Sequence, residues 1–431
     1  MRSESAARYR CVGIGAGPAN LSLAALLHGD PETPNLVIDR KAEFSWHDDQ
    51  LIPGAALQVS LFKDLVSLSD PTSPFSFMAY LHDRGRIYHY LNAQFDSVPR
   101  QEFRNYLDWA SSRIENVVFG EEARSVDFVG DTFVVRTDKR TLLADNVVVG
   151  VGTVPWVPRF ARPHLGGTQF HVSEFRSRAA GLRDRRVAVI GGGQSGAEAF
   201  LDLISRPDGE LPHRVSWLSR RRNYFPLDDS PFTNEFYMPC HSDYFAELGP
   251  SVRAEVNSQQ VLTSDGISEA TAREIYQRIY VHRFITGAPQ LTGLYPNREV
   301  VSVEPCSPEG WSISVRHNDP ASCLEIFEAD VIIWATGFRP APMDFLAPLQ
   351  PRLERENDEY QVDADFAACW DGPADRNLFL QNAARGQRGL ADPNLSLNAW
   401  RSQRIVDRIR GVRSRDQHPA FIEWSPKTGA R

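Results

Sequence analysis

The sequence of 431 residues has no long apolar run. No stretch approaches the ~20 apolar residues that a membrane-spanning helix needs, and the first ten residues lack an apolar core. We therefore expect neither a membrane span nor a secretory signal. Positive charge is also limited, because 47 lysines and arginines against 55 acids leave a formal net charge of -8. That balance argues against a nucleic-acid partner.

Cysteines are few and scattered. There are five, an odd number, and no two are spaced C-x-x-C. This pattern excludes a dithiol redox motif and a cysteine zinc site, and it fits a reducing cytoplasm. The sequence also shows no low-complexity tract, no serine–histidine–acid order and no metal-ligand spacing. What remains is an ordinary globular composition, long enough for two or three domains of ~150 residues each.

A strand–turn–helix–strand pattern occupies residues 10–39. Its turn reads G-x-G-x-x-N, with Gly15, Gly17 and Asn20, and its second apolar run ends at Asp39. The first glycine allows a tight turn, the second lets backbone approach a pyrophosphate, and the terminal acid binds ribose hydroxyls. Because an acid suits an unphosphorylated ribose, this unit predicts FAD or NAD rather than NADP. Asn20 replaces the usual third glycine, and a plain strand–helix turn is the alternative.

A second unit of the same kind begins at residue 186. An apolar strand leads into 191–196, which reads GGGQSG and carries all three fingerprint glycines, and a helical pattern follows. The next strand ends in Ser219 and Arg220 instead of an acid. A ribose 2′-phosphate needs donors and positive charge at that position, so the unit predicts NADPH. The alternative is a solvated basic turn.

Two apolar strands, within 144–152 and 329–337, have the same spacing and are followed by proline-rich segments. We interpret the proline-rich segments as crossings between domains. Residues 223–245 are expected to form a long loop, and 268–284 a helix capped by Ser268. These patterns predict an α/β fold with two Rossmann-like domains and a small, partly helical insertion: an FAD domain at 1–160 and 334–431, an NADPH domain at 161–228 and 285–333, and a substrate-binding insertion at 229–284.

Two nucleotide sites with opposite ribose preferences imply FAD that is reduced by NADPH. Without a C-x-x-C motif the electrons do not pass to a disulfide, so dioxygen is the expected acceptor. Residues 167–175 read G-x-x-x-H-x-x-x-F, which resembles the linker motif of class B flavin monooxygenases.

Further segments resemble one branch of these enzymes. They are FSWHDDQL, LQVSLFKDLVSLSDPTSPFSF, GGGQSGAE, DDSPFTNE, TSDGI, ATGF and LSLNAWRSQRI. All are similar to the N-hydroxylating monooxygenases of lysine, ornithine and diamines, which supply hydroxylamines for siderophore assembly. The resemblance runs from about residue 9 to 424, and Asn20 is itself typical of this family.

The resemblance implies roles for particular residues. Lys63 would contact the substrate end distant from the reacting amine, Asn234 would contact substrate and nicotinamide, and Thr263 would lie at the substrate. The implied reaction is attack of a neutral amine on a flavin C4a-hydroperoxide held while NADP⁺ stays bound, with no dedicated acid or base evident. The expected cofactor-binding residues are Gly15, Gly17, Pro18, Asn20, Asp39, Trp46, His47, Gln58 and Leu395 for FAD, and Gly191, Gly193, Gln194, Ser195, Gly196, Ser219 and Arg220 for NADPH.

The choice of substrate stays open among lysine, cadaverine, putrescine and related amines. Lys63 suits a carboxylate and slightly favours lysine, whereas DDSPFTNEFYMP also resembles diamine enzymes, and Arg388 stands where relatives often have histidine. Two further hypotheses are a class B monooxygenase that oxidises carbon or sulfur, and a nucleotide-binding regulatory protein without turnover. A homo-oligomer, dimer or tetramer, is expected by resemblance.

Overall fold

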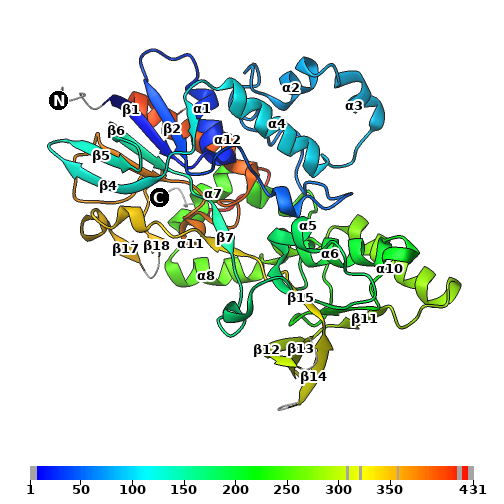
Figure 1. The fold of residues 1–431 in the computed structure, drawn as a ribbon. Helices are drawn as coiled ribbons and strands as arrows, with labels where there is room; N and C mark the ends of the chain where they lie inside the picture. Colours follow the sequence, from blue (N-terminus) through cyan, green and yellow to red (C-terminus); the bar gives the residue numbers. More distant parts are fainter. Residues whose placement is uncertain (1–6, 307–309, 320–322, 357–358, 415–419, 426–431) are drawn as a thin grey trace, which may run out of the picture.

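The computed structural model describes residues 7–306, 310–319, 323–356, 359–414 and 420–425. Two sheets organise the chain, the first mixed and the second wholly parallel (Figure 1). The first has the order β3-β2-β1-β6-β5-β4, and β19 pairs with β6. Its strands are β1 (Arg8–Ile14), β2 (Asn35–Asp39), β3 (Val117–Phe119), β4 (Ala123–Val129), β5 (Thr132–Thr137), β6 (Thr141–Val149) and β19 (Asn377–Leu380).

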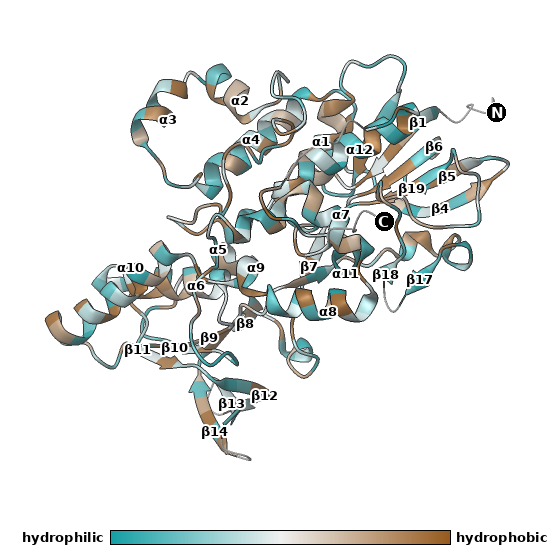
Figure 2. Cartoon of the chain, turned by 180° about the vertical axis from the view of Figure 1, so that it is seen from behind, coloured by the Kyte–Doolittle hydropathy of each residue, from teal (hydrophilic) through white to brown (hydrophobic). Residues whose placement is uncertain are grey.

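Strands β3, β2, β1, β6 and β19 run parallel, and β4 and β5 add an antiparallel hairpin. Residues 11–14 of β1, 36–38 of β2 and 147–149 of β6 are apolar and buried because both faces of this sheet are covered there. Helices α1 (Pro18–Leu26) and α12 (Asn398–Arg410) pack together although they are far apart in sequence (Figures 1 and 2). Asn398 Nδ2 donates to the Pro18 carbonyl oxygen at 2.9 Å, which fixes the start of α12 beside the start of α1.

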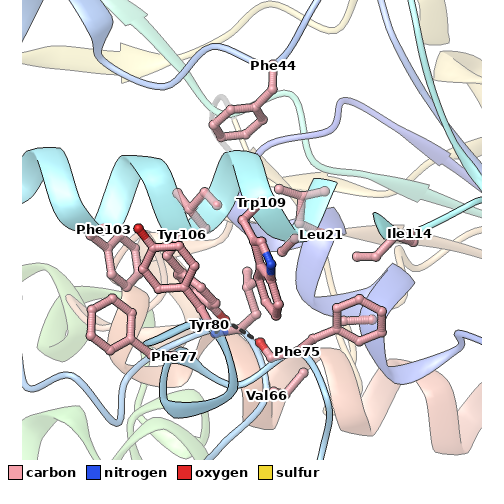
Figure 3. Packing of buried hydrophobic residues seen from close by; sticks show 14 of the residues in the cluster. Leu21, Phe44, Val66, Phe75, Phe77, Tyr80, Phe103, Tyr106, Trp109 and Ile114 are labelled. Atoms are coloured by element: carbon pink, nitrogen blue, oxygen red, sulfur yellow. Dashed lines mark hydrogen bonds between the residues drawn. The ribbon is translucent and has the colours of Figure 1, made fainter. Parts of the chain in front are cut away.

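A helical extension follows β2. It comprises α2 (Phe77–Asp83), α3 (Ile87–Ala93) and α4 (Arg100–Arg113). Its core is aromatic: Figure 3 shows Phe77, Tyr80, Phe103, Tyr106 and Trp109 packed edge to face and in offset stacks. The Tyr106 hydroxyl donates to the Phe75 carbonyl oxygen at 2.7 Å, the Tyr80 hydroxyl to Glu102 and the Trp109 indole to Asp83, so the polar groups of these three aromatic side chains are satisfied.

The second sheet has the order β11-β10-β9-β15-β8 and is wholly parallel. Helices α6 (Gln194–Ser205) and α10 (Glu269–Tyr280) pack against each other beside it (Figure 1). Ser268 caps α10 as predicted, because its hydroxyl accepts from the Thr271 amide. The strands are β8 (Gln169–His171), β9 (Arg186–Ile190), β10 (Arg214–Leu218), β11 (Thr292–Tyr295) and β15 (Val331–Trp334), and an antiparallel sheet of β12 (Arg298–Cys306), β13 (Gly310–His317) and β14 (Leu324–Ala329) follows β11.

The proline-rich segments after β6 and β15 lie side by side. They form β7 (Thr153–Pro155) and β16 (Phe338–Pro340), which pair antiparallel between the two sheets. The two apolar segments with the same spacing, within 144–152 and 329–337, are both buried strands, as expected. The first is part of β6 in the first sheet, and the second is β15 in the second sheet. The chain therefore leaves the first sheet and returns to it at one place.

The expectation of a long loop over residues 223–245 is wrong in part. Residues Thr233–Tyr237 form a 3-10 turn, η5, and Pro239–Glu247 form α7. Pro239 is the first helical residue, where its missing amide hydrogen costs nothing. Helices α7 and α8 (Pro250–Gln259) both contact α11 (Arg385–Arg388), next to the first sheet's return segment, whereas α10 packs on α6. Residues 229–284 therefore contact both sheet units.

The remaining helical and extended segments are short. They are η1 (Asp48–Gln50), η2 (Arg162–His164), η3 (Val172–Glu174), α5 (Phe175–Arg178), η4 (Asp208–Glu210), α9 (Leu262–Asp265), a π-helix (Val281–Ile285), η7 (Asp344–Leu346), η8 (Gln350–Arg352), β17 (Arg355–Glu356), β18 (Glu359–Tyr360) and η9 (Leu395–Leu397). Within the described ranges no helix is long and apolar enough to cross a membrane, and no group of three metal-ligating side chains occurs. The expectation about a secretory signal falls largely on residues 1–6, outside the described residues.

We predict that His171 makes stability depend on pH. Burial lowers the pKa of its imidazole to about 4. The Ser173 amide donates to Nδ1, and Nε2 donates to the Gly337 carbonyl oxygen, which holds the neutral tautomer. Since the unfolded chain takes up this proton near pH 6.5, stability is full above that pH and falls as pH drops toward 4.

Chemical unfolding at pH 7 and pH 5 measures the effect. His171→Gln should lose less stability than the wild type over this interval, by about 2 kcal/mol. The control is His89→Gln, which replaces an exposed imidazole. Equal losses of stability in the wild type and in His171→Gln would contradict the assignment.

Candidate cofactor and substrate sites

The first fingerprint loop borders a cavity of about 760 Å³. Its volume lies within the range of cofactor pockets, about 300–1,000 Å³. Seven of the nine residues expected to hold FAD line it. They are Gly15, Gly17, Pro18, Asp39, Trp46, His47 and Leu395.

The loop needs glycine at position 15, and at Gly17 it is open to the cavity. Gly15 has φ +92°, and a Cβ there would lie 2.6 Å from the Gly150 carbonyl oxygen at the end of β6. A Cβ on Gly17 would meet no atom within 4 Å, which leaves open the space where a pyrophosphate would approach the start of α1. Asp39 is fixed beside this loop because its Oδ2 accepts from the Ala16 amide at 2.8 Å. This cradle fits a dinucleotide with free ribose hydroxyls.

Asn20 supports the loop from behind and does not line the cavity. Its side chain is fully buried, and Nδ2 lies 2.9 Å from the Gly15 carbonyl oxygen and 3.2 Å from that of Val148. Its Oδ1 accepts from Gln381 Nε2 at 2.8 Å. The residue that breaks the glycine fingerprint thus ties α1 to β6 and to the end of β19.

Aromatic and apolar groups form the far part of the cavity. The Trp46 and His47 rings meet edge to face at 4.8 Å, and His47 has a left-handed backbone with φ +54°. Its ring is accessible from the cavity yet enclosed by protein, and this enclosure lowers the pKa of His47 to about 4. At neutral pH it therefore offers an uncharged donor and acceptor. Leu395 lines the same cavity and begins the short turn before α12.

The second fingerprint loop borders a cavity of about 540 Å³. Gly196 does not line it but lets α6 approach, because a Cβ there would collide with the Gly191 carbonyl oxygen. Gly191 has φ +139°, and its own Cβ would collide with the Ala335 carbonyl oxygen. Of the residues expected at the two cofactors, those that line this cavity are Gly191, Gly193, Gln194, Ser195, Ser219, Arg220 and Gln58.

The arginines after β10 differ in what they contact. Arg221 folds back, and its guanidinium donates to the carbonyl oxygens of Gly192 and Asp265. Arg222 pairs with Asp319 at 2.6 Å. Arg220 is exposed at the cavity, and its side chain makes no hydrogen bond or ion pair to the residues that the structure describes. One uncommitted guanidinium beside the buried Ser219 fits a 2′-phosphate.

Three contacts that the sequence did not reveal join the segments that follow β2 to α6, beside the second cavity. Arg100, at the start of α4, forms a two-pronged ion pair with the buried Glu198 of α6, both bonds at 2.9 Å. Gln50 donates to the Ser195 hydroxyl at 2.8 Å. Gln58, expected at the flavin, instead lines the second cavity, and its Nε2 lies 3.4 Å from Gln194 Oε1. Since each pair spans about a hundred residues or more, no local pattern signals it.

The predicted substrate residues gather around a tyrosine that the sequence analysis missed. Lys63 Nζ lies 5.3 Å from the centre of the Tyr237 ring, and the Tyr237 hydroxyl donates to the Thr263 carbonyl oxygen at 2.6 Å. Asn234 lies on the same turn, η5, with an exposed side chain whose Nδ2 donates to the Asp229 carbonyl oxygen. Lys63, Thr263 and Asn234 line neither of the two cavities.

Lys63 is a half-buried cation without a carboxylate. Burial lowers the pKa of its ammonium group, and no ion pair to it occurs among the described residues. A cation–π contact to Tyr237 offsets only part of the desolvation. The site can therefore accept an anion at Lys63.

Comparison with known proteins decides the family. The profile of the family described as L-lysine 6-monooxygenase/L-ornithine 5-monooxygenase matches residues 7–340. The chain belongs to this family. It is an FAD- and NADPH-dependent monooxygenase that hydroxylates a primary amine nitrogen. Family membership favours nitrogen over carbon or sulfur as the oxidised atom, and an enzyme over a regulatory protein without turnover.

Individual relatives agree along nearly the whole chain. The L-lysine N6-monooxygenase of Escherichia coli is 36% identical over 97% of this chain and 98% of its own. The solved structure of the FAD-bound cadaverine monooxygenase DfoA from Erwinia amylovora has a TM-score of 0.91 at 26% identity, covering 98% and 99%. The Kutzneria ornithine N-hydroxylase with reduced FAD, NADP⁺ and L-ornithine has a TM-score of 0.86 at 29% identity, covering 94% and 99%. The predicted α/β fold with two Rossmann-like units is confirmed.

We predict that Arg220 distinguishes NADPH from NADH. Arg220→Ala should lower kcat/KM for NADPH about tenfold or more, because a charge-assisted bond is worth roughly 1.5–3 kcal/mol. The value for NADH should stay nearly unchanged, since NADH lacks the 2′-phosphate. Steady-state NAD(P)H oxidation measures both values. The matched control is Arg222→Ala, which removes an equally exposed guanidinium that already has a partner, and equal losses with both nucleotides in Arg220→Ala would refute the site.

Proposed function

We propose that this enzyme hydroxylates the side-chain nitrogen of L-lysine for hydroxamate siderophore biosynthesis. The observation that carries the choice of lysine is the half-buried ammonium group of Lys63, which has no carboxylate partner in the described part of the chain. The substrate's carboxylate would supply that partner. The L-lysine N6-monooxygenase of Escherichia coli, at 36% identity, supports the same choice.

The cofactors are assigned to the cavities by their ribose contacts. FAD occupies the first, where Asp39 suits free hydroxyls, and NADPH occupies the second, where Ser219 and Arg220 suit a phosphate. Reduced FAD activates dioxygen for transfer of one oxygen atom. The proposed division into an FAD domain (1–160 and 334–431), an NADPH domain (161–228 and 285–333) and an insertion (229–284) follows the two sheets.

The protein's part in the reaction is to hold the amine and keep it uncharged. A free lysine amine has a pKa of about 10.4, so it must lose a proton before it acts as a nucleophile. Trp46 and Leu395 give the cavity apolar surface, which disfavours an ammonium group and lowers the pKa of a bound amine. The charged end of the substrate is held by Lys63, with Asn234 and Thr263 on the neighbouring turns.

The second candidate is a diamine such as cadaverine or putrescine. One observation favours it: burial lowers the pKa of Lys63, which makes its ammonium group easier to neutralise beside a second ammonium group. The cadaverine monooxygenase with a TM-score of 0.91 supports the same candidate, because a diamine-using protein shares this fold.

We propose further that the enzyme works in the cytoplasm as a homo-oligomer, a dimer or tetramer. Exposed apolar side chains on α3 and, separately, on the π-helix support an oligomer, because exposed apolar groups often mark contacts between proteins. They include Tyr88, Leu91, Phe284 and Ile285.

Lys63 separates the two candidates. If lysine is the substrate, Lys63→Ala should raise the KM for lysine about tenfold or more, since roughly 1.5–3 kcal/mol of charge-assisted binding is lost. Flavin reduction by NADPH should change little. If a diamine is the substrate, Lys63→Ala should leave its use unchanged or improve it. Hydroxylamine formation from lysine, cadaverine and putrescine measures these effects.

Two further variants control this test. Lys139→Ala removes an exposed lysine and should leave every KM unchanged. Lys63→Arg keeps the charge and should retain part of the affinity for lysine. A Lys63→Ala enzyme with the wild-type KM for lysine would show that the carboxylate is bound elsewhere.

A further inference from the structure

A buried guanidinium lies behind the first cavity. Arg401, on α12, is 1% exposed and forms an ion pair with Asp392, whose side chain is fully buried, with Nη1 and Oδ1 3.1 Å apart. Nη1 also donates to the Asp392 carbonyl oxygen at 2.6 Å. Nε donates to Gln381 Oε1 at 3.2 Å, and Nη2 donates to Asn382 Oδ1. One side chain thus binds three residues from two segments.

Each of these acceptors lines the first cavity, or is connected to residues that line it. Asn382 lines it directly, with a left-handed backbone at φ +60°. Gln381 Nε2 donates to Asn20 Oδ1, and Asn20 in turn donates to the Gly15 carbonyl oxygen of the fingerprint loop. Asp392 precedes residues 393–395, which line the cavity on the side of α12.

Stability alone does not account for this arrangement. Replacing a buried ion pair with apolar side chains of similar volume is often neutral or stabilising. What a guanidinium offers and an apolar side chain does not is geometry, because its planar set of N–H donors holds several acceptors at fixed angles. Here it fixes the end of β19, the 392–395 loop and, through Gln381, the loop that begins α1.

We propose that Arg401 is a positioning residue for FAD, which sets the shape of the first cavity before the cofactor binds. Arg401 does not line the cavity and acts through Asn382, Gln381 and Asp392. A cavity fixed in advance loses less conformational freedom on binding, so FAD binds more tightly. This inference rests on the proposed placement of FAD in the first cavity.

The competing explanation is that Arg401 only packs the interior. Arg388 offers a matched comparison, because it is 3% exposed, pairs with Asp243 at 2.6 Å, and lies over the same Phe366 ring as Arg401. None of these contacts of Arg388 involves a residue that lines the first cavity. A general loss of packing would affect both variants alike, whereas positioning of FAD would affect only Arg401.

The experiment titrates flavin-free full-length protein with FAD and follows flavin fluorescence, with thermal unfolding of the same flavin-free samples. Arg401→Lys keeps the charge but loses the fork, and should raise the Kd for FAD tenfold or more. Asn382→Gly removes the acceptor while keeping the left-handed backbone, and should raise it severalfold. Arg388→Lys should stay within twofold of the wild type, even where its Tm falls as far as that of Arg401→Lys.

The double variant Arg401→Lys/Asn382→Gly tests the connection. Its Kd for FAD should be no higher than that of Arg401→Lys, because both changes break the same contact between Arg401 and Asn382. Additive increases in Kd would overturn the proposal. A wild-type Kd in Arg401→Lys or in Asn382→Gly, or an equal rise in Arg388→Lys, would also overturn it. If Arg401→Lys does not fold, Asn382→Gly alone decides. A wild-type protein that binds no FAD would instead overturn the assignment of the cavity.

Discussion

Contact of backbone against backbone at the ends of parallel strands is the constraint on which both nucleotide sites depend. In the first unit Gly15 meets the carbonyl oxygen of Gly150, and in the second Gly191 meets that of Ala335. Neither position has room for a Cβ atom. The two loops can therefore turn sharply enough to point a helix start at a phosphate only because the neighbouring strand ends against bare backbone.

The third fingerprint position shows two solutions to one packing problem. Gly196 lets α6 close onto its strand, whereas Asn20 fills the corresponding space with a carboxamide that bonds to the backbone around it. The second solution connects the loop to Gln381, and so to the far end of the chain. The shape of the first fingerprint loop therefore depends on residues after 376.

The sequence predicted those parts of the structure that local patterns encode. Gly15, Asp39, Gly191 and the strands before them are readable because turn geometry and strand periodicity act over a few residues. The contacts between Arg100 and Glu198, and between Lys63 and Tyr237, join distant segments, so no spacing reveals them. Helix α7 was missed because its aromatic and acidic residues resemble a loop.

The pairing of β7 with β16 has a consequence for how the chain is assembled. Pro155 lies opposite Phe338 in this ladder, so the segment between them begins and ends at the same point of the first unit. The unit built on the second sheet is thus inserted into the unit built on the first sheet at one pair of strands. A tight turn that joined β7 directly to β16 would leave the first sheet continuous without the insertion. A different domain could likewise be inserted between these two strands without altering the first sheet.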